Sequence, residues 1–327
     1  MKRISVVVLS VLSVVAAVPA EADASAPRDY PARPIRLIVP GPPGVPPDLA
    51  ARVFSDRLAT ALGKPIVVEN RPGATGTIGL AEIARASADG YTIGILGMPY
   101  TVSPNFFPQL TYDTARDLAP VGQVVWSSQV LVVRSASPWR TLDDLLSAAR
   151  AKPGDLTVSS GGSGVTSHLV GEMLKLRAGV DMRHIPFKGS MASLAAVMGG
   201  QIDFMFAPAG SSVGLVKSGK LRPLAAATPA RFVAYPDVPT MAELGFPGFD
   251  VRDWNGIVAP AGTPREIIAR LASEVRSATA DPLVKERLAA ISMEPALDSG
   301  PEQFGALIRA ELERWAKFVR DTGIRAD

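Results

Sequence analysis

The sequence predicts an α/β protein built as two lobes that face each other across a cleft. Short apolar runs alternate with amphipathic stretches, which is the pattern of parallel strands connected by helices. The pattern runs through two rounds, and a returning strand with further helices follows them. With 327 residues, 47% of them hydrophobic, the chain can bury a sizeable core. Open α/β sheets bind ligands at the carboxyl ends of their strands, so two such lobes can enclose one between them.

The first round begins with a buried strand at 35–40 and a helix at 48–63, whose apolar residues share one face. Gly63 suits the C-terminal end of that helix. The other elements predicted in this round are a strand at 66–70, a helix at 79–88 and a strand at 91–97.

The second round begins with a strand at 130–133. Thr141 and Asp144 follow it with the spacing of a helix-capping pair, before an apolar helical run. The other elements of this round are strands at 156–160 and 202–207, strand-like runs at 182–187 and 221–228, and helices at 167–179 and 190–199.

The tail returns the chain to the first lobe. It adds a strand at 256–262 and amphipathic helices near 264–279, 282–291 and 301–321. We therefore expect lobe one to comprise 30–131 plus 251–327, and lobe two to comprise 132–250.

The first residues have the form of a secretory signal. Lys2 and Arg3 precede an apolar run at 4–18 that is short for a membrane span, and small residues follow it. Cleavage fits at Val18-Pro19-Ala20 or at Ala24-Ser25-Ala26. We expect a signal peptide at about 1–26 and an exported protein, and a retained N-terminal anchor is the alternative.

Composition excludes several classes of function. Without cysteine the chain has no disulfide, thiol nucleophile or zinc-thiolate site. The only two histidines, His168 and His184, are too few for a multi-histidine metal centre. The net charge of +3 comes without a basic cluster longer than a pair. We therefore expect no metal, no cofactor and no nucleic-acid partner.

The stretch VSSGGSGVTSHL, residues 158–169, ends a strand in glycines and hydroxyls just before a helix. Such a turn offers backbone N–H groups, free hydroxyls and a helix N-terminus, which together attract an anion. In lobe one, the strand before the first helix ends in a partner loop, PGPPGVPPD, at 40–48.

A series of short motifs then carries a family resemblance. In order they are YPARPIRLIVPGPPG…D, VVENRPGATGTIG, DGYTIGIL, SGGSGVTSHL, HIPFKG, GGQIDFMF, YPDVPTMAELGFPGF and APAGTP. Over residues 30–325 the chain resembles the periplasmic substrate-binding proteins of the tripartite tricarboxylate transporter system, of the Bordetella uptake gene (Bug) type.

This resemblance implies a type II periplasmic-binding fold with hinge strands and C-terminal helices. Family members close on a small ligand, often a carboxylate, which a loop from each lobe pinches. The loops that match here are 41–48 and 160–167. The loaded protein, expected to be a monomer, then docks on membrane permease subunits and catalyses nothing. The candidate ligand-binding residues are Gly44, Val45, Asp48, Met98, Tyr100, Ser160, Gly161, Gly162, Ser163, Gly164, Val165, Thr166, His168, Phe187 and Ala207.

The first loop departs from the family pattern, because Val45 and Pro46 replace flexible glycine and Pro47 stands where a hydroxyl is usual. Proline has no N–H to donate. The anion therefore either relies mainly on the second loop or differs from a plain dicarboxylate. Two further departures make the pocket less polar, namely Phe187 in place of tyrosine and Ala207-Pro208 in place of a polar pair. The donors left in the first loop are the amides of Gly41, Gly44, Val45, Asp48 and Leu49.

Several candidates have a structural alternative. Asp48 can contact a ligand amine or hold its own loop, and His168 can cap, pack or reach the ligand, with a structural role favoured. Met98 and Tyr100 are candidates for an apolar wall. His184 is expected to pack and Lys188 to be solvated, whereas Trp254 and Asn255 either line the cleft or pack the hinge.

Two rival functions remain to be compared. An enzyme with a nucleophile elbow needs Gly-x-Ser-x-Gly, and around Ser163 this pattern fails because Val165 stands at its last position. The stronger rival is a sensor that presents its closed form to a membrane-bound signalling protein. The sequence does not separate sensing from transport, because both use the surface of a closed two-lobe protein.

Overall fold

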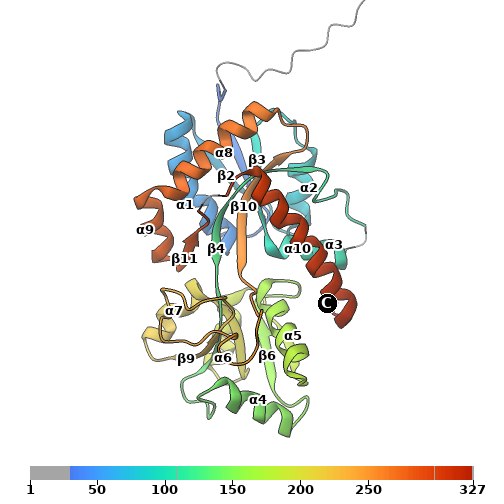
Figure 1. The fold of residues 1–327 in the computed structure, drawn as a ribbon, viewed down its shortest axis with the longest axis vertical. Coiled ribbons are helices and arrows are strands. Elements are labelled where there is room, and N and C mark those ends of the chain that lie inside the picture. The colour runs from blue at the N-terminus through green and yellow to red at the C-terminus, as the bar shows by residue number, and fades with distance from the viewer. Residues whose placement is uncertain (1–29, 108, 298, 326–327) are drawn as a thin grey trace, which may run out of the picture.

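The computed structural model describes residues 30–325, apart from 108 and 298, as two lobes stacked end to end (Figure 1). Each lobe is built on its own sheet. The expected signal peptide at 1–26 lies outside the described residues. Within the described part of the chain, no helix combines the length and the apolar character needed to cross a membrane.

Lobe one has a sheet with the strand order β11-β4-β10-β3-β1-β2. Its strands are β1 (Ile35–Val39), β2 (Ile66–Asn70), β3 (Thr92–Gly97), β4 (Leu118–Ser127), β10 (Asp253–Pro260) and β11 (Met293–Pro295). Its helices are α1 (Pro46–Leu62), the 3-10 turn η1 (Ala74–Gly76), α2 (Thr77–Arg85), α3 (Met98–Phe106), α8 (Arg265–Ala280), α9 (Pro282–Ala290) and α10 (Pro301–Thr322). β1 pairs in parallel with β2 and β3, whereas β10 runs antiparallel to β3 and β4.

Lobe two has a sheet with the order β7-β6-β8-β5-β9. Its strands are β5 (Gln129–Arg134), β6 (Thr157–Ser160), β7 (Arg183–Pro186), β8 (Phe204–Pro208) and β9 (Leu221–Ala226). Its helices are α4 (Leu142–Ala151), α5 (Thr166–Ala178), α6 (Ser190–Met198) and α7 (Ala209–Lys217). The predicted capping pair is confirmed, because the Asp144 N–H donates to Thr141 Oγ1 at 3.1 Å and the Thr141 N–H donates to the Asp144 carboxylate at 2.9 Å.

The predicted strands and helices are confirmed within a few residues at each end, but the strands of each sheet are not all parallel. The sheets are mixed because β4 leaves lobe one and β10 re-enters it, so these neighbours run in opposite directions. β4, α3 and α7 were not predicted at all. The reason is their content of proline, glycine and serine, which is typical of a loop between elements.

Two chain crossings form the hinge. β4 ends at Ser127 and β5 begins at Gln129, slightly before the boundary expected from the sequence. The second crossing runs from β9 to β10 through residues 227–252 (Figure 1). Backbone hydrogen bonds join the crossings, since the Ala227 N–H donates to the Gln129 carbonyl at 2.9 Å and the Val251 N–H donates to the Ala227 carbonyl at 3.2 Å. The start of β5 and the approach to β10 are therefore held together.

α10 covers the junction from lobe one. Its Phe304 ring packs edge-on against Trp254 of β10, with ring centroids 5.5 Å apart, and both side chains are fully buried. Gly256 lies directly beneath Phe304, because a Cβ on Gly256 would be 2.2 Å from the ring. Glycine at this position allows α10 to approach the strand closely.

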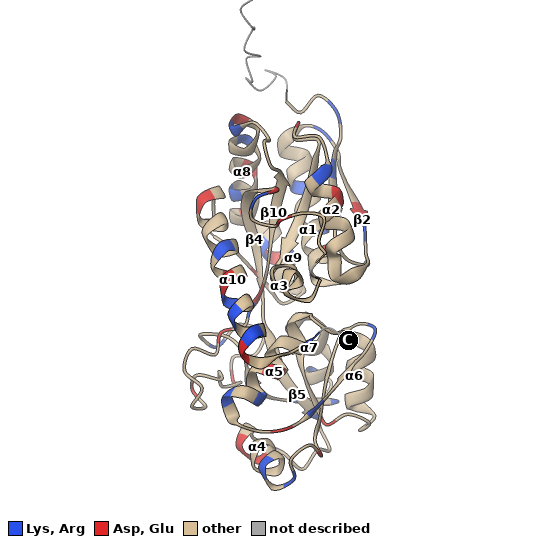
Figure 2. Ribbon diagram, turned by 90° about the vertical axis from the view of Figure 1, so that its right-hand side faces the viewer, with Lys and Arg blue, Asp and Glu red and all other residues tan. Residues whose placement is uncertain are grey.

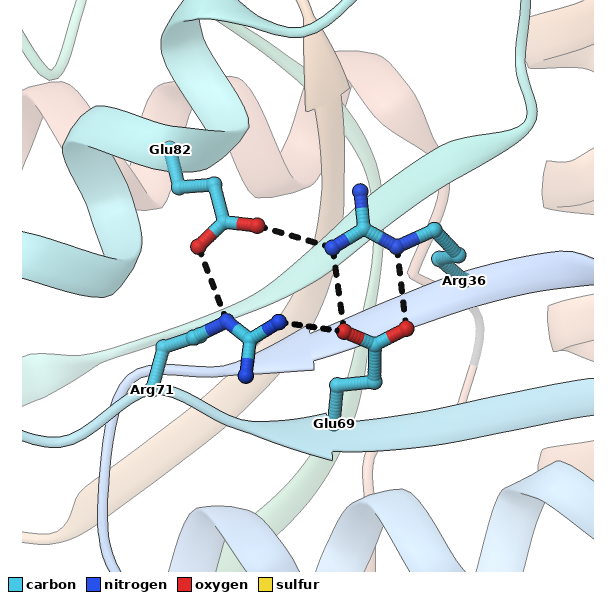
Figure 3. Close-up of polar contacts among 4 residues, drawn as sticks. All are labelled: Arg36, Glu69, Arg71 and Glu82. Carbon is cyan, nitrogen blue, oxygen red and sulfur yellow. Dashed lines mark hydrogen bonds and ion pairs between the residues drawn. The ribbon is translucent and has the colours of Figure 1, made fainter.

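An ion-pair quartet ties β1, the end of β2 and α2 together (Figure 3). Arg36 contacts Glu69 at 2.9 Å and Glu82 at 2.8 Å, while Arg71 contacts Glu69 at 2.7 Å and Glu82 at 3.0 Å. Each half-exposed pair contributes less than about 1 kcal/mol. The quartet also fixes the position of Arg71, which begins the segment that leads from β2 to η1.

Replacing Gly256 with alanine is expected to destabilise the protein by about 1–3 kcal/mol, because the new methyl group overpacks the Phe304 contact. Urea unfolding measures this change. Gly214→Ala in α7 is the matched control, since a Cβ there meets no atom within 4 Å, and it is expected to be neutral or slightly stabilising. Equal stabilities of the two variants would contradict the packing argument.

Candidate functional site

The cleft between the lobes is the point where helix N-termini converge. α1, α2, α5, α6 and α7 all begin with, or directly after, a residue that lines it, and the second residue of α3, Pro99, lines it as well. The first N–H groups of a helix are unpaired and its N-terminus carries partial positive charge, so such an arrangement favours an anion. The cavity between the lobes has a volume of about 250 Å³.

Both lobes line this cavity. Lobe one contributes Pro40, Gly41, Pro42, Val45, Pro46, Pro47, Gly73, Thr75, Gly76, Pro99, Tyr100 and Asp253. Lobe two contributes Gln129, Gly161, Val165, Thr166, Ser167, Gly189, Ser190 and Pro208. These residues include no lysine, arginine or histidine, so any anion held here is held by backbone and hydroxyl groups.

The second loop, residues 160–167, keeps its most useful donors free. Its glycine amides are used internally, since the Gly161 N–H donates to Ser167 Oγ at 3.2 Å and the Gly162 N–H to Ser160 Oγ at 3.2 Å. In contrast, the N–H groups of Thr166 and Ser167, at the start of α5, have no hydrogen-bond partner among the described residues. These amides are therefore available to a ligand.

The first loop, residues 41–48, has fewer donors than its length suggests. The buried Asp48 carboxylate accepts hydrogen bonds from the Gly44 N–H at 2.8 Å, from Asn70 at 3.0 Å and from Arg52. Asp48 therefore holds the loop, as one of its two predicted roles requires. Burial alone would raise the pKa of Asp48, but the bonds from Arg52, the Gly44 amide and Asn70 lower it below its ordinary value.

The remaining first-loop amides correct the set of donors expected from the sequence. The N–H groups of Asp48 and Leu49 both donate to the Val45 carbonyl, at 2.9 and 3.0 Å, so they are unavailable, as is that of Gly44. In the part of the loop that the structure describes, only the amides of Gly41 and Val45 have no partner. Pro46 and Pro47 occupy the first turn of α1, where they supply shape without donors.

Tyr100 forms a wall of the cleft and supports the first loop from below. Its hydroxyl donates to the Pro40 carbonyl at 3.1 Å. Gly76 lies against the ring, because a Cβ there would be 2.3 Å from it, and its φ of +85° also favours glycine. Burial raises the pKa of Tyr100 above its usual range, and the nearby Asp253 carboxyl adds to this effect, so the phenol stays protonated.

Asp253 is the ionisable carboxyl of the cleft lining, and it lies at the first residue of β10. Burial raises its pKa to about 7. The Thr166 hydroxyl and the N–H groups of Trp254 and Met98 lower the pKa again in part, although Thr166 makes no hydrogen bond of normal geometry with it. The carboxylate of Glu311 on α10 raises it further.

A stacked pair of histidines supports the second loop from behind. The rings of His168 and His184 lie 3.9 Å apart. The Gly164 N–H donates to His168 Nδ1 at 3.1 Å, and Ser160 Oγ contacts His184 Nε2 at 2.7 Å. Neither ring lines the cleft. Both histidines thus have the structural role that the sequence favoured, and they set the shape of the loop.

The family follows from a direct comparison. A sequence model described as "Tripartite tricarboxylate transporter family receptor" matches residues 50–324. The chain belongs to this family. Proteins of the family are periplasmic solute-binding proteins of two-lobe fold, which agrees with the resemblance found in the sequence and with the architecture described above.

Individual relatives agree with this assignment. BugT of Bordetella pertussis is 37% identical over 298 residues, which cover 90% of this chain and 91% of that protein. Rpa4515 of R. palustris, solved with adipate, is 32% identical with a TM-score of 0.83 over 91% of this chain and 99% of that one. MatC of Rhodopseudomonas palustris, solved with bound malate, is 31% identical with a TM-score of 0.79 over 89% of this chain and 100% of that one.

The structure divides the predicted site residues of this receptor into two groups. Val45, Tyr100, Gly161, Val165 and Thr166 line the cleft. The others support it or lie beside it: Gly44 and Asp48 in the first loop, Ser160, Gly162, Ser163, Gly164 and His168 in or behind the second, Met98 in the core at the start of α3, Phe187 beside lobe two's core and Ala207 within β8.

Sequence reasoning missed other lining residues. Gln129 and Asp253 lie at the starts of the strands that follow the two crossings, and their only signal was a polar residue just ahead of an apolar strand. Neither Trp254 nor Asn255 lines the cleft. Trp254 packs against α10, as its structural alternative requires. The remaining lining residues that were missed are Gly73, Thr75, Gly76, Gly189 and Ser190.

A larger hollow of about 680 Å³ lies beside α2 on lobe one alone, lined by Arg36, Ile78, Glu82 and Tyr112 among others. Helix N-termini do not converge on it, and lobe two contributes nothing to its lining. The surface charge elsewhere is mixed, since basic and acidic residues alternate along α4, α8 and α10 (Figure 2). The interlobe cleft is therefore the candidate site.

Asp253→Asn is expected to stabilise the ligand-free protein increasingly as the pH rises. The folded protein keeps the Asp253 proton up to a pKa of about 7, whereas the unfolded chain loses it near 3.8. Folding stability is therefore lost between these pH values, with a penalty on the order of 4 kcal/mol above pH 7. Urea unfolding at pH 4 and pH 8 measures the difference. Parallel pH profiles for the variant and the wild type would contradict the buried carboxyl's role.

Proposed function

We propose that this receptor captures a small carboxylate in the interlobe cleft, in the periplasm, and delivers it as a monomer to the membrane permease of a tripartite tricarboxylate transporter. The unpaired N–H groups of Thr166 and Ser167 at the start of α5 carry this proposal. Both residues belong to the first turn of a lobe-two helix and line a cavity of small-molecule size. A carboxylate accepts two such bonds, and the helix dipole adds to the attraction.

The distribution of donors supports binding mainly through lobe two. α5 offers its first amides to the cleft, whereas the corresponding turn of α1 carries Pro46 and Pro47. A carboxylate therefore docks first on the second loop, and the proline-rich first loop closes over it. The bound adipate and malate of the two related structures are carboxylates, which agrees with this ligand class.

Closure of the lobes links binding to delivery. The chain passes between the lobes at only two places, so a rotation there changes few contacts within either lobe. A ligand contacts both lobes only in the closed form of the protein. Binding therefore shifts the population toward that form. The permease then recognises the surface that closure brings together, which gives transport a direct dependence on ligand.

The expected result of a thermal-shift assay on the purified protein is stabilisation by carboxylates but not by their amides. Suitable probes are butyrate, succinate, malate and adipate, each with its amide as control. Ligand at 100 times its Kd adds about 2.7 kcal/mol, which for a chain of this size is a shift of several degrees. Equal shifts with the amides, or none with any carboxylate, would contradict the proposed ligand class.

Thr166→Pro tests the α5 amide directly, with Thr166→Ala as its control. Both variants lose the hydroxyl, but only the proline variant loses the N–H. Proline suits the first helical residue, and Val165 before it already has the extended backbone that a residue preceding proline prefers, with φ −79° and ψ 165°.

We expect Thr166→Pro to bind the best carboxylate of the panel about 10-fold more weakly than Thr166→Ala, equivalent to about 1.4 kcal/mol for one charge-assisted bond. Calorimetric titration measures both affinities, and the melting temperatures of the free variants check that α5 is intact. If the two variants bind equally well, the N–H of Thr166 does not contact the ligand.

A further inference from the structure

Three side chains of the cleft lining hold buried polar atoms without a partner. Gln129, Thr166 and Asp253 have exposed fractions of only 1%, 3% and 5%. Their atoms Oε1, Oγ1 and Oδ1 respectively make no hydrogen bond within the described chain. The other atoms of this kind that the structure describes belong to residues that do not line the cleft: Tyr112, Thr114, Trp254 and Asn255.

The position of these three side chains connects them to the hinge. Gln129 is the first residue of β5, Asp253 is the first residue of β10, and Thr166 opens α5. The first two follow the chain crossings, and the third lies on the loop expected to bind the carboxylate. All three residues line the same cavity of about 250 Å³, as do the first residues of α5.

The chemistry of the three atoms requires hydrogen-bond donors from the ligand. The Gln129 carbonyl oxygen only accepts hydrogen bonds, and an ionised Asp253 carboxylate does the same. The Thr166 hydroxyl can accept as well as donate. Buried polar atoms of this kind are costly to leave unpaired, so a ligand that satisfies them gains affinity and one that does not is rejected.

The charge of the cleft lining also favours a ligand group that donates hydrogen bonds. The cleft lining holds one carboxyl group and no cationic side chain. A second carboxylate of a plain dicarboxylate would approach Asp253 without a counter-ion, which is repulsive in a buried site. A cationic group on the ligand would instead pair with Asp253, and an ammonium carries three N–H donors for three acceptors. A hydroxyl carries only one.

We propose that Gln129, Thr166 and Asp253 form a subsite for an ammonium group, so that the preferred ligand is an aminocarboxylate rather than a plain dicarboxylate. This inference rests on the proposed function for its carboxylate end, which α5 binds. The ammonium end lies against the hinge residues, and the ligand thereby contacts both lobes.

Calorimetric titration with two matched series tests the subsite. The first series is butyrate, 2-hydroxybutyrate and 2-aminobutyrate, and the second is succinate, malate and aspartate. In the wild type we expect the amino member of a series to bind at least 10-fold more tightly than the member without the substituent. In Asp253→Asn this preference is expected to disappear, with weaker binding of the amino member and unchanged or tighter binding of the unsubstituted one.

Asp250→Asn is the matched control variant. It removes the same charge from the approach to β10, but Asp250 pairs with Arg252 at 2.9 Å at the surface and does not line the cleft. We expect its preference among the probes to equal that of the wild type. The subsite is refuted if hydroxy or unsubstituted members bind the wild type as tightly as amino members do. It is also refuted if Asp253→Asn weakens all members of a series equally.

One further probe separates failure of this inference from failure of the proposed function. 2-Aminobutanamide carries the ammonium group but no carboxylate. If it binds in an Asp253-dependent way while no carboxylate binds, the ammonium subsite stands and the carboxylate function fails. If carboxylates bind without regard to the amino group, the function stands and the subsite fails. If no probe binds, both are refuted.

Discussion

The convergence of helix N-termini on one cleft is the constraint on which the rest of the site depends. Each helix follows a strand of its lobe through a short turn, so the turns of both sheets meet where the lobes face each other. The partial charges at these ends replace the cationic side chains that the lining lacks. Because the helix ends supply this positive charge, glycine, serine and threonine are sufficient as lining residues for an anion site. The buried Asp253 carboxyl is the exception among the lining residues.

Much of the fold could be predicted because its elements obey local rules. The capping pair of Thr141 and Asp144, the glycine that ends α1 and the apolar runs of β1 and β6 all have short-range causes. β4 could not be found this way, because it carries Pro120 and Gly122 and is stabilised by pairing with β10 from far along the chain. α3 and α7 were missed for a similar reason, since packing at the cleft offsets their unfavourable helical composition.

The candidate site divides along the same line. The place of the second loop at the cleft could be predicted, because glycines and hydroxyls between a strand and a helix are typical of a ligand-binding turn. For Asp48 the sequence left two roles open, contact with a ligand or stabilisation of its own loop. The loop role depends on the hydrogen bond from Asn70, which only the fold brings near. Gln129 and Asp253 were not found, because a polar residue ahead of an apolar strand is too common a pattern to indicate a site, and a buried atom without a partner is a property of the three-dimensional surroundings.

The two prolines that open α1 separate recognition into independent halves. In the proposed binding mode, lobe two anchors the charged end of a solute through amides that no side-chain replacement can remove, apart from proline itself. Lobe one then contributes a rigid apolar contour formed by Val45, Pro46 and Pro47. Substitutions in that contour are expected to alter which carbon skeletons fit, while the amides that bind the carboxylate stay unchanged. Receptors of this type can thus change their ligand specificity and keep the same carboxylate-binding site.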